Sequence, residues 1–486
     1  MRDKVPTLLV LLFCFCAASR TIAATRDYEA FGKPIQPAAA DPVITSALKE
    51  VSQEEIQHTI GKLISFGNRN TLSSVTTDQK RSEGVLAAAD WIEAQFKTYS
   101  ATCGVCLEVK RDTFTAPVQN RIPKPTTIVN VYAILRGSDP VQARRMYLVT
   151  GHYDSRNSDT LDTYGAAPGA NDDASGVAVS LECARVLSKH KFPATLVFAA
   201  VAGEEQGLVG SAHLAQLAKG EGWQLDGVLN NDIVGGDTTP GDKLQDESAV
   251  RVFSEGIPAT ATPEEIHQIE AIGIENDSPS RELAREVLEV SETYLKPGQT
   301  ERGSGLEAVV EQRHDRFLRG GDHASFNREG FPAVRLTEWR ENFNHQHQNL
   351  RTENGIEFGD RIKFVDFAYV ARVARLNAAT LAMLASAPGK PRDVRIVTRN
   401  LDNNTTLTWK APEGAPSGTS YEIVWRVTTA SNWQYFAKLT SAGDSSTGEE
   451  HSATLPISKD NVIIGVRSVD SAGHMSPAVT AIPVRR

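Results

Sequence analysis

The sequence predicts an α/β protein with a mostly parallel mixed sheet flanked by helices, followed by a C-terminal all-β sandwich. Short apolar runs typical of buried strands alternate with amphipathic helical segments over most of the chain. From residue 393 onward the pattern changes to alternating β-branched runs with closely spaced turns and no helical period. The length of 486 residues exceeds that of one ordinary core, so at least two domains are expected.

The N-terminus has the layout of a secretory signal peptide over residues 1–23. Basic Arg2 and Lys4 precede a short apolar run, and small residues up to Ala23 offer a cleavage site. That run is too short to cross a bilayer, and no later segment is long and apolar enough to do so. We therefore expect a secreted or periplasmic protein without stable membrane insertion. Residues 24–41 are expected to form a linker or extended arm, and the sequence leaves open whether they are a cleaved propeptide.

Composition and charge exclude some classes of partner. The chain is 40% hydrophobic and 23% charged, as soluble globular proteins are, and its net charge of −9 argues against nucleic-acid binding through bulk charge. Cys103 and Cys106 have the spacing of a redox pair, half a zinc site or a short disulfide, and export favours the disulfide. Cys183 lies in a helical stretch and is expected to be a buried free thiol.

Residues 42–386 are expected to form the α/β domain. Strands are predicted at residues 128–135, 146–151, 194–201 and 227–233. Helices are predicted at residues 43–63, 83–97, 175–190, 280–295 and 363–386, and a decorating loop at 236–262. Because ligands bind beyond the carboxyl ends of the strands in such sheets, the residues that directly follow each strand are the first candidates for a site.

A linker rich in proline and glycine at residues 387–392 precedes the predicted sandwich at 393–486. This last region resembles a fibronectin type III domain. Trp409 ends its second predicted strand and Tyr421 opens its third. The partner of the sandwich stays unassigned.

His152 and Asp154 end the second predicted strand. Two residues apart on extended chain, they point the same way, so the carboxylate can fix the tautomer of a metal-binding imidazole. Asp172 opens the helix that follows, in a turn of small and acidic residues where it can hold cations. The alternative roles are a solvent-facing histidine for His152 and helix capping for Asp172.

Paired glutamates, Glu204 and Glu205, follow the third predicted strand. Their side chains diverge, so one carboxylate can hold a metal while the other acts as a general base. Asp232 lies at the end of the fourth predicted strand. Far along the chain, His345 or His347 can close a metal site. An acidic first helical turn and an ordinary turn aspartate are the structural alternatives.

The order His, Asp, Glu-Glu, Asp and a distant His resembles that of the M28 family of metallopeptidases. The resemblance spans roughly residues 43–386. It is carried by the phrases GHYDS, PGANDDASG, AGEEQGLVGS and GGDHASF, and by the segment at residues 65–69. It implies a zinc exopeptidase-like fold.

The resemblance also implies two Zn²⁺ ions held by five side chains. One zinc would be held by His152 and Asp232, and the other by Glu205 and His347. Asp172 would bridge both. These nitrogen and oxygen donors are the types that zinc prefers.

The catalytic roles follow from the same resemblance. Glu204 would be the general base, and Asp154 would orient the imidazole of the first zinc ligand. At the last ligand the family pattern is His-Thr-x-x-Asp-Thr, and the threonine that follows here favours His347 over His345. Arg351 stands where the family has aspartate, which removes one acidic partner of that ligand.

The implied function is that of an aminopeptidase acting on peptides with a free N-terminus. The resemblance implies that Asp322 and His323 line the pocket, and the alternative is a capped turn. Two alternatives remain. One is a single-zinc glutaminyl cyclase-like enzyme, disfavoured because His152 completes a second metal set. The other is a catalytically inactive peptidase-fold binding protein, which would be expected to have lost ligands.

Overall fold

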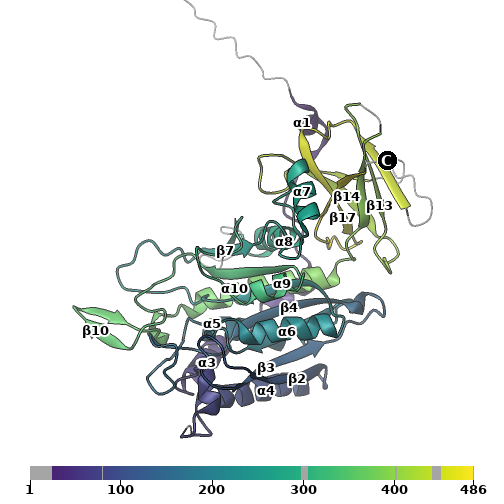
Figure 1. The fold of residues 1–486 in the computed structure, drawn as a ribbon. Helices are drawn as coiled ribbons and strands as arrows, with labels where there is room; N and C mark the ends of the chain where they lie inside the picture. The colour runs from purple at the N-terminus through teal and green to yellow at the C-terminus, as the bar shows by residue number, and fades with distance from the viewer. Residues whose placement is uncertain (1–24, 79, 297–304, 400–401, 440–449, 485–486) are drawn as a thin grey trace, which may run out of the picture.

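An eight-stranded mixed sheet organises the chain up to residue 386 (Figure 1). Its strand order is β2-β3-β5-β4-β6-β9-β7-β8, with β5, β4, β6 and β9 parallel at the centre. The strands are β2 Leu107–Ala116, β3 Thr126–Leu135, β4 Arg145–His152, β5 Thr195–Val201, β6 Gln224–Asn231, β7 Ala249–Ser254, β8 Glu307–Glu311 and β9 Ala333–Glu338. The predicted mixed α/β sheet is confirmed. Antiparallel pairing joins β3 to β2 and β5, and β7 to β9.

The computed structural model describes residues 25–78, 80–296, 305–399, 402–439 and 450–484. The predicted signal peptide at residues 1–23 lies outside these ranges. Within them, no helix has the length and apolar character needed to span a membrane. Cys103 and Cys106 form a disulfide, and Cys183 is a buried free thiol, as predicted.

Helices cover both faces of the sheet. Successive residues of β5 alternate between two apolar cores: Phe198 and Ala200 face one, Val197 and Ala199 the other. The first core is shared with α2 Pro42–Leu48, α3 Gln53–Ile64, α4 Gly84–Thr102, α5 Ala174–Leu187, α8 Pro279–Tyr294 and α10 Phe367–Ser386. The second is shared with α6 Val209–Gly220 and α9 His323–Arg328. The remaining helical elements are α1 Asp27–Phe31, α7 Pro263–Ile272, and the 3₁₀ turns η1 Thr71–Val75, η2 Gln142–Arg144 and η3 Ile362–Phe364.

Two sequence-based expectations are wrong in detail. The helix predicted at 43–63 is two helices, because Asp41 caps α2 and Ser52 caps α3 through the N–H of Glu55. The loop predicted at 236–262 contains β7, a strand that pairs with β8 and β9 near the sheet edge.

The residues after 391 form two sheets packed face to face. One has the order β1-β15-β14-β17-β18 and the other β16-β13-β12-β19, and Trp409 and Trp425 are buried in the apolar core they share. The strands are β1 Lys33–Pro34, β12 Arg392–Val397, β13 Thr405–Lys410, β14 Ser420–Val427, β15 Tyr435–Lys438, β16 Glu450–Leu455, β17 Val462–Val469, β18 Val479–Thr480 and β19 Ile482–Val484. A small hairpin, β10 Arg351–Glu353 and β11 Ile356–Phe358, lies before α10.

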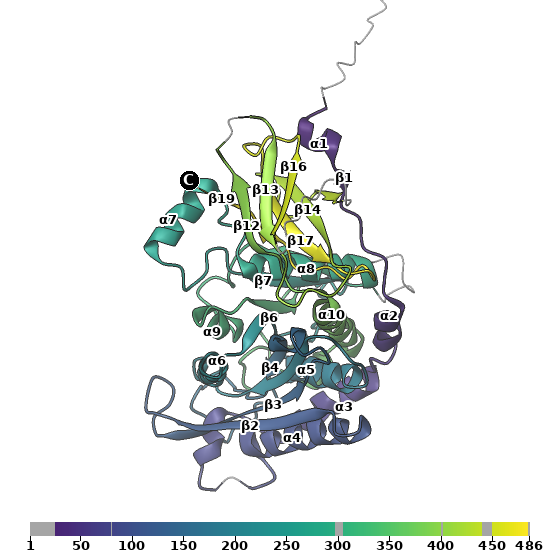
Figure 2. The same ribbon diagram turned by 90° about the vertical axis from the view of Figure 1, so that its right-hand side faces the viewer.

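The N-terminal arm joins the sandwich to the rest of the chain. Its strand β1 pairs with β15, and Trp425 Nε1 donates to the backbone carbonyl of Tyr28 at 3.0 Å. The arm then runs down one side of the molecule to α2 (Figure 2). At its lower end, the Asp41 carboxylate lies 2.9 Å from Nε2 of His474, which belongs to the sandwich. The arm therefore contacts both parts of the molecule.

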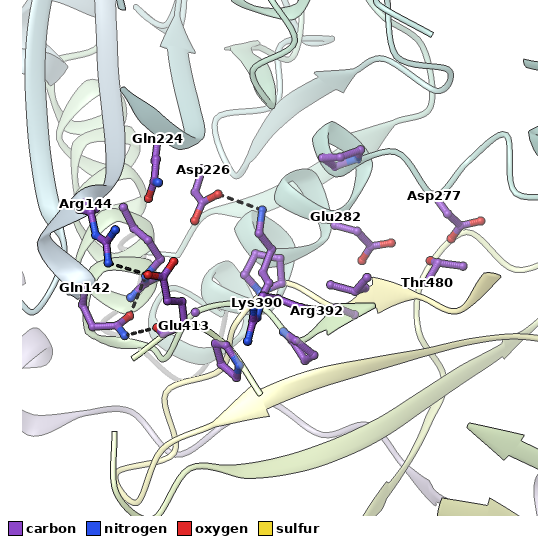
Figure 3. Close-up of a pocket in the computed structure, with 18 of the residues that line it drawn as sticks. Gln142, Arg144, Gln224, Asp226, Asp277, Glu282, Lys390, Arg392, Glu413 and Thr480 are labelled. Atoms are coloured by element: carbon purple, nitrogen blue, oxygen red, sulfur yellow. Dashed lines mark hydrogen bonds and ion pairs between the residues drawn. The ribbon is translucent and has the colours of Figure 1, made fainter. Parts of the chain in front are cut away.

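A cavity of about 510 Å³ lies where the sandwich meets the α/β part (Figure 3). Lys390, in the predicted linker, pairs with Asp226 at 3.2 Å, and Arg144 pairs with Glu413 at 2.7 Å. Gln142 donates to the backbone carbonyl of Glu413 at 3.0 Å. These polar groups satisfy one another across the boundary, so they hold the two parts together.

A buried ion-pair network also joins the sandwich to the α/β part. The side chain of Asp277, just before α8, is fully buried and accepts two hydrogen bonds from Arg426 of β14 at 2.8 and 2.7 Å. Arg285 of α8 lies 3.3 Å from the same carboxylate. Trp433 Nε1 donates to Glu282 Oε2 at 2.9 Å. Because water is excluded, each charge depends on its partners.

We expect Asp277→Ala to lower the free energy of unfolding by about 3–5 kcal/mol, because it leaves Arg426 buried without its carboxylate and Arg285 with Glu282 alone. Equilibrium denaturant unfolding of the full chain measures the change. Glu108→Ala, which removes an ion pair to Arg136 that is exposed on both sides, is the control and should leave the midpoint nearly unchanged. Equal effects of the two substitutions would contradict the importance of this network.

Candidate metal centre

The carboxyl ends of three parallel strands bring most of the predicted site together. His152 is the last residue of β4, Asp232 directly follows β6, and Glu205 lies four residues after β5. Asp172 lies just before α5, which follows β4 in the chain. His347 comes from the loop between β9 and β10. All five side chains meet at one edge of the sheet, as such a topology favours.

The five side chains form two clusters that share one residue. The first cluster is His152, Asp172 and Asp232, and the second is Asp172, Glu205 and His347; within each, one ligand atom per residue lies within 4.8 Å of the others. Asp172 turns Oδ1 to His152 Nε2 at 3.1 Å and Oδ2 to His347 Nε2 at 2.9 Å. One carboxylate thus faces both clusters, one oxygen to each.

The residues present fit a pair of divalent cations. His152, Asp172, Glu205 and Asp232 are all buried, and their imidazole and carboxylate donors suit zinc. Among the described residues, His152 Nε2 and Glu205 Oε1 are buried and make no well-aligned hydrogen bond, although Asp172 and His347 lie 3.1 Å from them. Burial disfavours charge on His152, yet the facing carboxylates of Asp154 and Asp172 raise its pKa well above 6.5. A site that attracts a proton this strongly also attracts a metal cation.

Asp173, the neighbour of the shared aspartate, takes the capping role. Its Oδ1 accepts the N–H of Gly176 in the first turn of α5 at 2.9 Å, and its Oδ2 accepts the N–H of His152 at 2.9 Å. Capping by Asp173 leaves Asp172 free to face the clusters.

Asp154 lies behind His152, as predicted. Its Oδ1 is 3.3 Å and its backbone carbonyl 3.2 Å from His152 Nδ1, so both can accept the outer N–H of that imidazole. Its Oδ2 accepts from Thr71 Oγ1 at 2.9 Å and from the N–H of Glu205 at 3.2 Å. Asp154 therefore connects the two strand ends that carry His152 and Glu205.

Two supporting residues were missed by the sequence analysis. Arg335, fully buried in β9, lies 3.0 Å from Asp232 Oδ1. Asp360 accepts the N–H groups of Asn171 and Asp172, the latter at 2.7 Å, and burial raises its pKa to about 7. Arg335 is a charged residue within the apolar run at 333–338, and this pattern could have indicated a buried functional charge. It was missed because no strand was predicted there.

The structure distinguishes the two candidate histidines. His345 is buried, its Nδ1 contacts Asp237, and its ring stacks on Phe364 at 3.8 Å. His347 instead lies 3.1 Å from Glu205 Oε1. Of the two, His347 is thus the one that faces the clusters.

Arg156 occupies the outer side of the second cluster. Its Nε donates to Glu205 Oε2 at 2.8 Å, and its Nη2 lies 2.6 Å from His347 Nδ1. A metal-binding histidine normally donates its outer N–H to an acceptor, and a guanidinium has only donors. His347 therefore has a different outer partner from His152.

Glu204 and Glu205 diverge, as predicted. Glu205 is buried in the second cluster, whereas half-buried Glu204 lines an open cleft of about 580 Å³. Burial raises the pKa of Glu204 well above 4.5. Gly203 and Gly207 have φ of +81° and +111°, so the turn itself requires glycine on each side.

Asp322 and His323 do not line this cleft. Both are fully buried, and His323 Nε2 lies 3.0 Å from the backbone carbonyl of His314. Burial raises the pKa of Asp322 to about 7 and lowers that of His323 to about 3. Their position corrects the comparison with pocket-lining residues.

Comparisons with known proteins show the family of this chain. The family model described as peptidase family M28 matches residues 130–356. A probable zinc metalloprotease of Leptosphaeria maculans is 45% identical over 446 residues, which is 92% of this chain and 98% of that protein. One from Pyrenophora teres f. teres is 44% identical, covering 93% of this chain and 89% of its own length.

The chain is also similar to solved structures, including an aminopeptidase and a glutaminyl cyclase. The Legionella pneumophila LapA aminopeptidase has a TM-score of 0.49 and 20% identity, covering 73% of this chain and 78% of its own. A Bacteroides thetaiotaomicron glutaminyl cyclase has a TM-score of 0.46 and 14% identity, covering 68% and 97%.

We expect Arg156→Gln to tighten cation binding at the second cluster about tenfold, because glutamine offers an acceptor to the outer N–H of His347. Metal content after dialysis against a series of buffered chelator concentrations measures this. Arg156→Met, which removes the charge without adding an acceptor, is the matched control and should gain less. If Arg156→Gln instead loses metal more readily than the wild type, the ion pair of Arg156 to Glu205 is what holds the second cluster together.

Proposed function

Because this chain belongs to peptidase family M28, we propose that it is a secreted aminopeptidase that uses two zinc ions to hydrolyse N-terminal residues from peptides. Family membership makes it a zinc metalloprotease, that is, a peptide hydrolase. The observation that carries the di-zinc proposal is Asp172, which presents one carboxylate oxygen to each cluster. A residue held in this way suits a bridging ligand.

The five cluster residues would hold the metals. His152 and Asp232 would hold one zinc and Glu205 and His347 the other, with Asp172 between them. When bound, zinc supplies Lewis acidity that polarises a scissile carbonyl and lowers the pKa of water. Two zinc ions would bring four positive charges, and the three carboxylate ligands bring three negative ones. The remaining positive charge would attract an oxygen nucleophile.

Glu204 is the proposed general base. It lines the open cleft beside the buried ligand Glu205, so its carboxylate is within reach of a substrate while its neighbour is not exposed. Its carboxylate takes a proton from the attacking water and passes it to the nitrogen of the leaving amine.

The site also bears on the alternatives. A single-zinc glutaminyl cyclase needs only one complete cluster, whereas both clusters are complete in this chain. A catalytically inactive binding protein would be expected to lack a ligand or the base, and all six residues are present at one edge of the sheet. These observations favour the aminopeptidase proposal.

Secretion is part of the proposal. It rests on the signal-peptide pattern of residues 1–23. The disulfide between Cys103 and Cys106 supports it, since disulfides persist in oxidising compartments. The proposed partners are peptide substrates with a free N-terminus, and no nucleic acid.

Metal analysis of the glutamate variants tests the assignment of base and ligand. The wild type should carry two zinc ions. Glu204→Gln should keep both while losing about 10²-fold or more in kcat, since general-base catalysis contributes on that order. Glu205→Gln, the matched neighbour, should lose zinc from the second cluster. Exchanged phenotypes would show that the two roles are assigned the wrong way round, and one zinc at full activity would support the cyclase alternative.

Blocking the α-amine of the substrate tests whether the enzyme is an aminopeptidase. A free α-amine can lie against Glu204 or bind a metal through its lone pair, whereas an acetylated nitrogen does neither. Losing such a contact costs about 2 kcal/mol, or about thirtyfold in rate. We expect kcat/KM on N-acetyl-Leu-Gln-NH₂ to fall at least that far below the value for Leu-Gln-NH₂. Equal rates, or internal cuts in a folded protein, would leave a zinc hydrolase that is not an aminopeptidase.

A further inference from the structure

The cleft beside the second cluster is rich in arginine. Arg121, Arg156 and Arg319 line the same cavity as Glu204. Arg156 is engaged with Glu205, as described above. The charges of the other two are less completely balanced by the protein.

Arg121 reaches the cleft from the turn between β2 and β3. Its Nη1 donates to the backbone carbonyl of Glu205 at 3.0 Å, which places the guanidinium next to the second cluster. Among the described residues, no carboxylate lies within ion-pair distance of Arg121. A neutral carbonyl satisfies one N–H without cancelling the charge, so the group retains attraction for an anion.

Arg319, on the loop between β8 and α9, shares a single carboxylate with two other arginines. Glu341 lies 2.8 Å from Arg319, 2.6 Å from Arg316 and 3.1 Å from Arg251. Arg319 also donates to Gln346 Oε1 at 3.2 Å, and Gln346 Nε2 donates to the shared aspartate of the clusters at 3.2 Å. Arg316 also pairs with Asp315 at 2.9 Å, so these three arginines face two carboxylates and leave one positive charge in excess at this wall of the cleft.

Apolar side chains surround these charges. Leu208, Leu318 and Phe343 line the same cavity, and Leu318 and Phe343 are exposed to solvent. They offer contacts to an apolar substrate side chain.

We propose that this cleft selects peptides that carry a carboxylate on the residue that follows the scissile bond. The inference rests on the proposed aminopeptidase function and names its substrate class. The carboxylate belongs to an acidic side chain or to the C-terminus of a dipeptide, and both present the same group to Arg121 and Arg319.

The charges of the cleft also orient such a substrate. Among the described residues, no cationic side chain lies within ion-pair distance of Glu204, so Glu204 attracts the α-ammonium group. Arg121 and Arg319 repel that group and attract the carboxylate. A peptide with an α-ammonium group on its first residue and a carboxylate on its second therefore binds in one direction. Its first peptide bond then lies between Glu204 and the arginines.

Paired dipeptides measure the preference. Leu-Glu-NH₂ and Leu-Gln-NH₂ differ by one charge at nearly equal size, and Leu-Gln with a free C-terminus places the charge on the backbone. We expect kcat/KM for Leu-Glu-NH₂ to exceed that for Leu-Gln-NH₂ about tenfold, mainly through KM. The ratio should shrink between 50 mM and 500 mM NaCl, because salt screens the attraction: the Debye length falls from about 13 Å to about 4 Å over this range. A gain for Leu-Gln over its amide identifies the C-terminal carboxylate as the source, and a gain for Leu-Glu-NH₂ the side chain.

Single substitutions assign the preference to its residues. Arg121→Gln and Arg319→Gln should each lower the Leu-Glu-NH₂ to Leu-Gln-NH₂ ratio several-fold. Arg313→Gln is the matched control: it lies on the same loop as Arg319, but its guanidinium packs over the ring of Phe317 at 3.9 Å and does not line the cavity. The control should keep the full ratio. A ratio unchanged in both arginine variants would overturn the assignment.

Binding to a Glu204→Gln variant separates this inference from the proposed function. Isothermal titration calorimetry of the Glu204→Gln variant with the same peptides measures their dissociation constants without hydrolysis of the peptide. If Leu-Glu-NH₂ binds about tenfold more tightly than Leu-Gln-NH₂ while the wild type cleaves neither, carboxylate recognition stands and the aminopeptidase proposal fails. If neither carboxylate improves binding or cleavage, the inference is wrong even where hydrolysis is observed.

Discussion

The shared carboxylate of Asp172 is the interaction on which the whole site depends. Its two oxygens face His152 and His347, which lie almost 200 positions apart in the chain. Moving this one side chain would open both clusters at once. The surrounding structure fixes it from the backbone side, since Asp360 accepts its N–H and Asp173 caps the helix that begins beside it. A site of this kind needs its support to come from rigid elements, and here it comes from strand ends and a helix start.

The same constraint explains why the charged residues around the clusters are so extensively paired. Buried carboxylates are costly unless cations or hydrogen-bond donors compensate them. Arg335 does this for Asp232 and Arg156 for Glu205; Arg156 contacts Glu205 Oε2, whereas Oε1 faces His347. The protein thereby leaves one face of each ligand free for a metal. The two outer arginines differ in what they contact, because only Arg156 also reaches a histidine ligand.

Much of the site was predictable from the sequence because strands carry their ligands in a local pattern. An apolar run followed at once by His152 or Asp232 is visible without knowledge of the fold. Arg156 and Asp360 gave no such signal, since their contacts to His347 and Asp172 join loops 191 and 188 positions apart. The division of the helix at 43–63 had a local signal, the Ser52 cap, that the apolar period obscured. The strand β7 was hidden by the polar residues on both sides of it.

The N-terminal arm has a consequence for how the chain is made. Tyr28 and its bonding partner Trp425 are 397 positions apart, and β1 has no other strand to pair with among the described residues. During synthesis at about 5–20 residues per second, the arm therefore waits roughly 20–80 seconds after its emergence before its partner strands exist. The α/β part can assemble in that interval, because its helices and strands lie between the two partners. Completion of the sandwich is then a late step in the folding of the chain. Translation that terminates early leaves the arm as an unpaired strand that chaperones and proteases can bind.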